Sequence, residues 1–577
     1  MINPHIFWKN LGGTGQLLLG SAILFSIVRS FLPVTLGWDA GVQMQSAYRL
    51  IQGLGLTTIV HAAPEADLAR HPLVVPLSHW PPGYSCLLAG LIKLGVNGEW
   101  SIKIICLFST VLGWLGWSQI STALLDDPEL ASVKRSRWLR WTLFLLPIFM
   151  TPSWRGTDII DWAAIPYVII LLERLISENW KNVRLAFGLG LLVGGMYAFR
   201  YAATFVFVGC VMVFLLAYLA RPNLRLFSRM ALFVLGFSLF WLPVHWHTTQ
   251  QLGLADLDAT QFNFHHLRYG FGILWENLSH STLELWPWLP NKFRALFLDS
   301  LVGKVLTFPI TPFLFLLPLL LSTKWRSKVS PEAFPYLLIF SCLIVADIAM
   351  IVVETALTGW PEVIRESRYY FPVYLPFWFM IGDVVLVKWA RSNRNEFFPF
   401  PILSSRFLRF TLLSVAVLGA LIFGFFFIDQ INFKSRLFSN LLNKTWSDNF
   451  GSEGMKTHKA HTQAVMIALA AQEPDSIFYI EDYAHLAYNL ADPVGRYRPI
   501  PPAPLWNNFY SSQDIQVYWI VEAAWDEHHQ PIIMASGSSQ EVKALEKSIP
   551  FEPIQEIPEE EVIIYRSNIS ANTHFVH

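Results

Sequence analysis

Long apolar runs limit what this chain can fold into more than any other feature of its sequence. Several reach about 18 or more residues, the length of a helix that crosses a lipid bilayer. Examples are Leu17–Thr35, Ala202–Ala220, Tyr336–Val353 and Phe410–Ile428. Only 15% of the 577 residues are charged, whereas a soluble protein carries about 25%. The sequence therefore predicts a polytopic α-helical membrane protein.

The overall charge and the cysteines exclude other classes. The chain has 42 basic and 42 acidic side chains, and without a basic surface we expect no nucleic acid partner. The 4 cysteines lie in apolar segments and form no disulfide framework or CxxC metal motif. No small-residue cleavage site follows the first apolar run, so we interpret that run as a retained helix and not as a signal peptide.

Clusters of basic residues predict the topology, because cytoplasmic loops are enriched in Lys and Arg. Five candidate inner loops contain Lys134, Arg135, Arg137 and Arg140; Lys181 and Arg184; Arg221, Arg225 and Arg229; Lys324, Arg326 and Lys328; and Arg391, Arg394, Arg406 and Arg409. The apolar stretch Gly83–Val96 would make a helix of only about 21 Å, against a bilayer core of about 30 Å. We interpret it as a helix lying on, or dipping into, the outer face.

This assignment leaves about eleven transmembrane helices in a domain of residues 1–432. The predicted spans are approximately 15–35, 102–124, 138–152, 160–176, 185–199, 202–220, 230–246, 303–322, 334–356, 372–389 and 410–429. The first outer loop, residues 36–101, then contains juxtamembrane helices, and a second long outer loop runs from residue 247 to about 302. No internal repeat stands out.

Residues 433–577 differ in composition and predict a small α/β domain outside the membrane. They contain apolar segments at Ser476–Ile480, Val517–Val521 and Val562–Tyr565, and a helical pattern at Gln540–Ile549. This part has 10 basic and 18 acidic side chains, a net charge of −8, and the remainder of the chain has +8. The balanced total is therefore an average over two unlike parts, and the partition agrees with an extracytoplasmic position of the acidic domain.

The first outer loop contains the residues with the clearest chemical meaning. Asp39 follows the first predicted span within the segment Gly37–Gly41. A carboxylate at a helix end beside aromatic residues is well placed for a general base, although Asp39 could instead simply cap the following helix. Further along the loop are Tyr48–Leu50, Gly53–Gly55 and His79–Tyr84, the last with the sequence His-Trp-Pro-Pro-Gly-Tyr.

The order of these motifs resembles the GT-C superfamily of membrane glycosyltransferases. The resemblance is closest to the group that contains protein O-mannosyltransferases and lipid A aminoarabinose transferases. It also includes Phe199–Ala202 and Arg365–Pro372, each directly before a span, and covers roughly residues 10–430. Each motif is loose, and the order of the motifs is more specific than any one of them.

The resemblance implies an inverting transfer of a sugar from a polyprenyl-phosphate-linked donor to an acceptor hydroxyl. The acceptor would be a glycan, a lipid or a protein on the outer, periplasmic or extracellular, side of the plasma membrane. By motif position, Asp39 would activate it. Some members hold a divalent metal ion with paired acidic residues, whereas Asp39 is flanked by Trp38 and Ala40. We therefore expect no cofactor and do not favour a divalent metal ion.

A phosphate leaving group also needs cations, because negative charge develops on it. Predicted outer ends of spans carry Arg155, Arg200, Arg365 and Arg368, and arginine suits bidentate phosphate contact. These arginines could instead contact membrane lipid headgroups or form ion pairs. Tyr369, Tyr84 and His79 are further candidates for binding the donor phosphate or sugar. Tyrosines at a span end more often belong to the aromatic belt, and the histidines show no zinc spacing.

Asp347 lies in the middle of a predicted span, and Asp158 and Asp161 lie at the outer end of another. Ionisable groups there are costly, and we favour a buried, paired or hydrogen-bonded structural role for Asp158, Asp161 and Asp347 over catalysis. Asp158 lies near Arg155 in the sequence and could pair with it and orient it.

Two other functions stay open at the level of sequence. A transporter or flippase for a lipid-linked or hydrophilic substrate would usually show internal repeats and polar residues in the middle of the membrane. Here most polar candidates lie at the predicted outer edge, which favours the enzyme. A structural membrane subunit whose outer domain binds partners is the third alternative.

Overall fold

The computed structural model describes the chain in separate stretches. These are residues 20, 23–24, 38–60, 73–77, 80–125, 156–220, 222–249, 334–358, 375–376, 379–380, 460–480, 496–499, 515–525, 531–533, 552–558 and 562–569. The chain divides into two compact units. The first contains Met1–Leu32, Ile104–Val244 and Asp258–Leu437, and the second contains Pro33–Lys103, His245–Leu257 and Phe438–His577.

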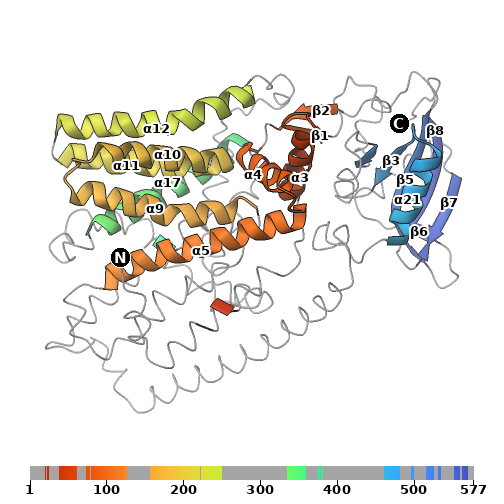
Figure 1. The fold of residues 1–577 in the computed structure, drawn as a ribbon, viewed down its shortest axis with the longest axis horizontal. Coiled ribbons are helices and arrows are strands. Elements are labelled where there is room, and N and C mark those ends of the chain that lie inside the picture. Colours follow the sequence, from red (N-terminus) through yellow and green to blue (C-terminus); the bar gives the residue numbers. More distant parts are fainter. Residues whose placement is uncertain are drawn as a thin grey trace, which may run out of the picture. The chain divides into compact units, whose positions relative to one another are not determined.

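Long helices that lie side by side form the described part of the first unit (Figure 1). They are α5 (Gly98–Leu125), α9 (Asp158–Ser177), α10 (Val183–Phe199), α11 (Thr204–Ala220), α12 (Leu224–Thr249) and α17 (Phe334–Thr358), with the short helix η3 (Tyr201–Ala203) between α10 and α11. Within the described residues, 4 helical segments are long and apolar enough to cross a membrane, at Trp100–Leu124, Tyr201–Ala220, Leu224–Thr248 and Phe334–Val353. These helices indicate a membrane protein.

The observed helices coincide with many of the predicted spans. Helices α5, α9, α10, α11, α12 and α17 contain most or all of the spans predicted at 102–124, 160–176, 185–199, 202–220, 230–246 and 334–356. The spans predicted at 15–35, 138–152, 303–322, 372–389 and 410–429 lie outside, or almost entirely outside, the described residues. The stretch Gly83–Val96 forms the short helix α4 (Gly83–Lys93), of 11 residues.

Close packing against α5 positions the beginning of α9. A Cβ atom added at Gly113 would lie 2.1 Å from the ring of Trp162, so no larger residue fits there without a shift. The indole Nε1 of Trp117 donates to the carbonyl oxygen of Trp162 at 3.0 Å. The hydroxyl of Tyr167 donates to the carbonyl oxygen of Leu112 at 2.9 Å. The first turns of α9, where Asp158 and Asp161 lie, are thereby held at a defined height along α5.

A compact motif follows in the first predicted outer loop. Helix α3 (Trp38–Ile51) leads into the antiparallel hairpin of β1 (Thr57–Val60) and β2 (Leu73–Pro76), and α4 packs against α3. The turn between α3 and β1 contains Gly53 at φ 79° and Gly55 at φ 75°. Glycine adopts such left-handed backbone conformations without steric cost, which explains the Gly-rich end of the helix.

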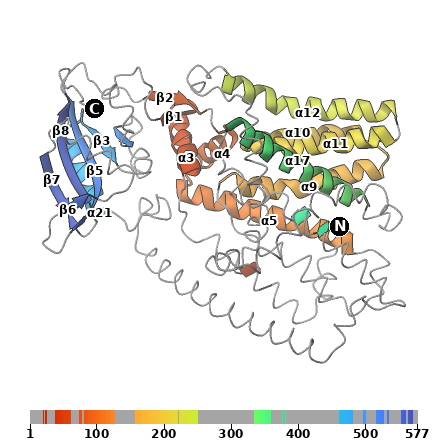
Figure 2. The same ribbon diagram turned by 180° about the vertical axis from the view of Figure 1, so that it is seen from behind.

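The end of the chain forms a mixed α/β structure (Figure 2). It consists of α21 (Ala460–Gln472), β3 (Ile477–Ile480), β4 (Tyr497–Pro499), β5 (Ile515–Trp525), β6 (Pro531–Ile533), β7 (Glu552–Ile557) and β8 (Val562–Ile569). The strand order is β4-β3-β5-β8-β7, and β6 pairs with β5. Strand β3 is parallel to β4 and β5, whereas β8 is antiparallel to β5 and β7.

Helix α21 covers one face of this sheet. Its Met466 and Ala470 belong to a core with Phe478, Tyr518 and Ile564. Strands β3, β5 and β8 lie on the apolar segments noted in the sequence at Ser476–Ile480, Val517–Val521 and Val562–Tyr565. The sequence pattern missed α21, β4, β6 and β7, and the helix expected at Gln540–Ile549 lies outside the described residues.

Candidate functional site

Asp39 lies in the first turn of α3. The helix begins at Trp38, so Asp39 is its second residue and not the residue before it. A capping residue precedes the first helical residue, and the structure therefore does not support the interpretation of Asp39 as a simple cap.

The middle of helix α3, residues 40–47, is buried on all sides despite its many polar residues. Exposed fractions are 1% for Gln43, 1% for Gln45 and 0% for Ser46, close to the 0% of Met44, and 5% for Arg49 further along the helix. Buried polar groups are costly unless they are hydrogen-bonded. A short amphipathic helix at a membrane surface would expose one face, so the burial identifies α3 as an internal element of its unit.

Two side-chain hydrogen bonds connect α3 to β1. The hydroxyl of Thr58 donates to Oε1 of Gln45 at 2.7 Å, and Nε of Arg49 donates to the hydroxyl of Thr57 at 2.8 Å. The Thr57 hydroxyl in turn donates to the carbonyl oxygen of Leu54 at 3.0 Å. Because Gln45 and Arg49 are one helical turn apart, the two contacts hold the same side of α3 against consecutive strand residues.

Other elements hold α3 at two further points. The hydroxyl of Ser85, in α4, donates to the backbone carbonyl of Gln43 at 2.9 Å. The Tyr48 hydroxyl accepts a hydrogen bond from the backbone N–H of Gly98, the first residue of α5. Burial raises the pKa of Tyr48 more than this hydrogen bond lowers it, and burial lowers the pKa of Arg49. Both shifts reflect how far this helix is removed from water.

A second polar cluster lies in the first unit, at the beginning of α9. Arg200, at the junction of α10 and η3, forms an ion pair with Asp158. The two side chains are 14% and 11% exposed. The carbonyl oxygen of Arg200 accepts from the backbone N–H of Ala203 at 3.0 Å, which begins η3. The sequence suggested Arg155 as the partner of Asp158; Arg155 lies outside the described residues, so that pairing stays a prediction, and the pair that the structure describes is with Arg200.

Asp161 lies one turn further along α9 and differs from Asp158. It is 1% exposed, and neither of its carboxylate oxygens has a hydrogen-bond partner among the described residues. The expectation of a paired or hydrogen-bonded Asp161 is therefore wrong within this part of the chain. Asp347, in α17, is also buried, at 3% exposed. Acidic side chains thus occur inside the helices themselves, and not only at their ends.

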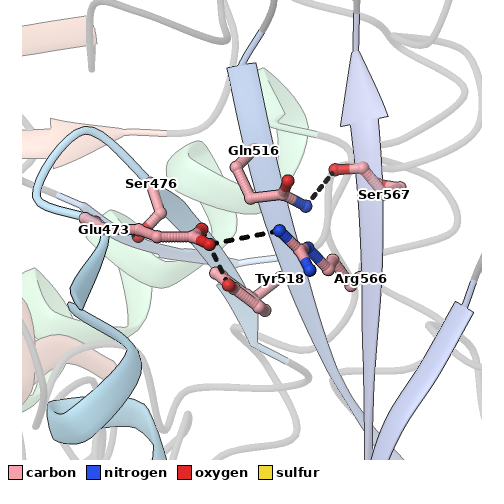
Figure 3. A network of polar contacts seen from close by, with 6 residues as sticks. All are labelled: Glu473, Ser476, Gln516, Tyr518, Arg566 and Ser567. Carbon is pink, nitrogen blue, oxygen red and sulfur yellow. Dashed lines mark hydrogen bonds and ion pairs between the residues drawn. The ribbon is translucent and has the colours of Figure 1, made fainter.

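A third polar cluster stabilises the α/β structure (Figure 3). Glu473, directly after α21, accepts from the Tyr518 hydroxyl at 2.7 Å and pairs with Arg566 at 3.2 Å. Nη1 of Arg496 donates to the carbonyl oxygen of Ala470 at 3.3 Å. Burial first, then Glu473, raises the pKa of Tyr518 to about 12. Each of these contacts connects the end of α21 to a strand or to the segment before one, so the cluster holds the helix on the sheet.

The other predicted site residues divide into two groups. Tyr84 lies in the first turn of α4 and is 0% exposed, so its ring packs inside the loop structure; its role in substrate binding stays a prediction. Arg155, Arg365, Arg368, Tyr369 and His79 lie outside the described residues. Sequence reasoning missed the contacts of Gln45, Thr57 and Thr58, although the Thr-Thr pair directly after the Gly-rich turn was a usable signal.

In the described stretches, no three His, Cys, Asp or Glu side chains come together in a way that would hold a metal ion. The expectation about cofactors therefore stays a prediction.

Comparisons with known proteins complete the description of the chain. No protein-family model matches it, and no curated protein sequence matches it. Similar solved structures include ArnT from Cupriavidus metallidurans in the apo state, with a TM-score of 0.38 and 11% identity over 95% of this chain and 97% of that one. They also include the same protein bound to undecaprenyl phosphate, with a TM-score of 0.34 and 10% identity over 95% and 97%. At these low TM-scores, residue roles in this chain rest on its own sequence and structure.

Proposed function

We propose that this protein is an inverting membrane glycosyltransferase of the GT-C type, with Asp39 as its general base. It would move a sugar from a polyprenyl-phosphate donor to an acceptor hydroxyl on the outer side of the membrane. The observation that carries the proposal is the place of Asp39: it opens a buried helix, held by hydrogen bonds to three other elements, directly after the first predicted span. The order of motifs in the sequence supports the same assignment.

The reaction that we propose has one bond-forming and one bond-breaking event. The Asp39 carboxylate takes the proton of the acceptor hydroxyl, and the acceptor oxygen attacks the anomeric carbon of the donor sugar. The bond between that carbon and the phosphate oxygen breaks on the opposite face, so the configuration inverts. The products are the glycosylated acceptor, polyprenyl phosphate as a monoester, and a protonated Asp39 that returns its proton to water.

Cationic side chains would stabilise the phosphate as its charge develops. Arg200 is the described candidate, and its ion pair with Asp158 fixes its position but also offsets much of its charge. Arg200 therefore suits orientation of the phosphate better than its neutralisation. The proposal assigns neutralisation first to Arg368, with Arg365 and Arg155 as further candidates, and it places Tyr369, His79 and Tyr84 around the donor.

The test is donor cleavage by the purified full-length protein in lipid nanodiscs. The probes are undecaprenyl-phosphate-linked hexoses and pentoses with a radiolabelled sugar, mixed with a bacterial membrane extract that supplies acceptors. We expect the wild-type protein to release undecaprenyl phosphate from at least one donor and to move the label to an acceptor. Asp39→Asn should reduce this transfer by about 1,000-fold or more, because the carboxamide cannot accept the proton.

Asp67→Asn is the matched control, an identical change in the same loop at a position with no assigned role. It should keep wild-type transfer. Full transfer by a well-folded Asp39→Asn variant would disprove the assignment of Asp39, whatever the donor.

A transporter or flippase is the second candidate function, and Asp161 is the observation that favours it. A buried acidic side chain within a transmembrane helix often belongs to a substrate or proton pathway. The same donor assay separates the two functions. A transporter would move the labelled lipid between leaflets of a vesicle and leave it intact, whereas the transferase consumes it.

A further inference from the structure

We propose that Gln45, Arg49, Thr57 and Thr58 are positioning residues for Asp39, acting through α3. This proposal rests on the proposed function. The Thr58–Gln45 and Arg49–Thr57 hydrogen bonds, at 2.7 and 2.8 Å, set how α3 is rotated and how far it advances toward the reacting groups. They act on the rate of the chemical step and not on binding of the donor.

The first reason is the position of these contacts around α3 relative to Asp39. At about 100° per residue, positions 45 and 49 lie roughly 100° around the helix from position 39. Tyr48, which contacts Gly98, lies on the side opposite to position 39. The side-chain contacts of Gln45, Arg49 and Tyr48 therefore lie on sides of the helix other than that of position 39, so they can fix its rotation without occupying the side on which Asp39 lies.

The second reason is that the contacts are shielded from water. Thr58 is 3% exposed, Gln45 1% and Arg49 5%. Water cannot simply replace a hydrogen bond in such a place, and loss of one partner leaves the other buried without its bond. The helix would have to shift or rotate to recover the loss, and every such movement is transmitted to the first turn.

The third reason is the conformation of the turn that connects α3 to β1. Gly53 and Gly55 make a tight turn, and the backbone N–H of Leu54 donates to the carbonyl oxygen of Arg49 at 2.9 Å. The strand therefore returns beside the helix that precedes it, and Thr57 and Thr58 contact the last turns of α3 from a short distance along the chain. Since α3 is one rigid element, fixing its last turns also fixes the direction of its first.

A misplacement of about 1 Å can reduce the rate of an enzyme by about 100-fold. The test is a pair of substitutions at Thr58 that differ in whether the hydroxyl is kept. Thr58→Val keeps the shape of the side chain and removes the hydroxyl, whereas Thr58→Ser keeps the hydroxyl. We expect Thr58→Val to lower kcat by about 10- to 100-fold with KM for the labelled donor within about 2-fold, and Thr58→Ser to restore most of the rate.

Thr110→Val is the matched control. Thr110 is also buried, at 4% exposed, and its hydroxyl donates to the carbonyl oxygen of Cys106 at 2.7 Å, within its own helix α5. This variant should keep the wild-type kcat. Thermal unfolding midpoints of all variants are measured in the same nanodiscs, so that a rate is compared only between folded proteins.

The outcomes separate the two proposals. If the wild-type protein transfers sugar and Asp39→Asn does not, but Thr58→Val keeps the wild-type kcat, the positioning role is wrong and the proposed function stands. An equal loss of kcat in Thr58→Ser or Thr110→Val would also overturn it, because the effect would then be one of general stability. Absence of transfer by the wild-type protein from every donor would overturn the proposed function, and the positioning role with it.

Discussion

Two arginine–carboxylate pairs in this protein have the same chemistry and different surroundings. Asp158 and Arg200 meet at the beginning of α9, with side chains 11% and 14% exposed. Glu473 and Arg566 meet at the end of α21, with side chains 33% and 42% exposed. Water screens the second pair and can replace either partner, but it does neither for the first. We therefore expect loss of one partner to cost little stability at the exposed pair and much more at the buried one.

The two clusters also differ in what surrounds the pair. Glu473 accepts from Tyr518 as well as from Arg566 (Figure 3), and backbone oxygens near the end of α21 accept from Arg496. Asp158 instead has Asp161 one turn away, whose carboxylate is buried and has no hydrogen-bond partner in the part of the chain that the structure describes. A satisfied cluster at a helix end is typical of structure. A buried carboxyl group without a donor among the described residues is typical of a group retained for function, since stability alone would remove it.

The largest effect should come from breaking the buried pair. Asp158→Ala leaves the guanidinium of Arg200 buried without this partner, and such a loss costs about 3–5 kcal/mol. We expect a clear fall of the thermal unfolding midpoint of the full chain in nanodiscs. Glu473→Ala is the control at the half-exposed pair and should lower the midpoint much less. Equal effects at the two sites would show that burial does not separate them.

A smaller effect of opposite sign should come from Asp161→Asn. The amide has nearly the same shape and no charge, so the variant avoids the cost of burying a carboxylate without a donor, and we expect a gain of about 1–3 kcal/mol. The midpoint should rise, and the same samples are assayed for sugar transfer. A fall in stability would mean that Asp161 has a partner beyond the described residues, and the contrast with Glu473 would then disappear.

The smallest effect should be the alkaline sensitivity of the α/β structure. The pKa of Tyr518 is raised to about 12, above the value near 10 of an unfolded tyrosine. A raised pKa means that the contribution of this group to stability is complete below about pH 10 and is lost as the pH rises toward 12. Its hydrogen bond to Glu473 contributes about 1 kcal/mol.

The measurement compares wild type with Tyr518→Phe, which has the same ring and no hydroxyl. The difference between their unfolding midpoints should be largest below pH 10 and shrink above it. Tyr479→Phe is the control, a buried tyrosine of β3 that pairs in the sheet register with Trp519, the residue after Tyr518. A constant difference for Tyr518→Phe across the pH range would contradict the assignment.

The helices and strands differ in how well the sequence predicted them. The apolar runs correctly predicted α11 and α17 nearly to the residue, and the alternating segments predicted β3, β5 and β8. Helix α21 was missed because Ala460–Gln472 is rich in alanine, and its role depends on the sheet that it covers. The Gly-rich turn after α3 was visible in the sequence, but the pairing of Thr58 with Gln45 was not.

The sequence by itself determined that the chain crosses a membrane and where several helices and strands lie. In lipid, a helix satisfies its own backbone hydrogen bonds, so a run of apolar residues suffices to specify it and no distant contact is required. Only the tertiary structure decided the pairs: Asp158 with Arg200, 42 residues further along the chain, Thr58 with Gln45, and Glu473 with Arg566. Such pairs depend on which elements pack together, and that choice is made by contacts between residues far apart in the chain.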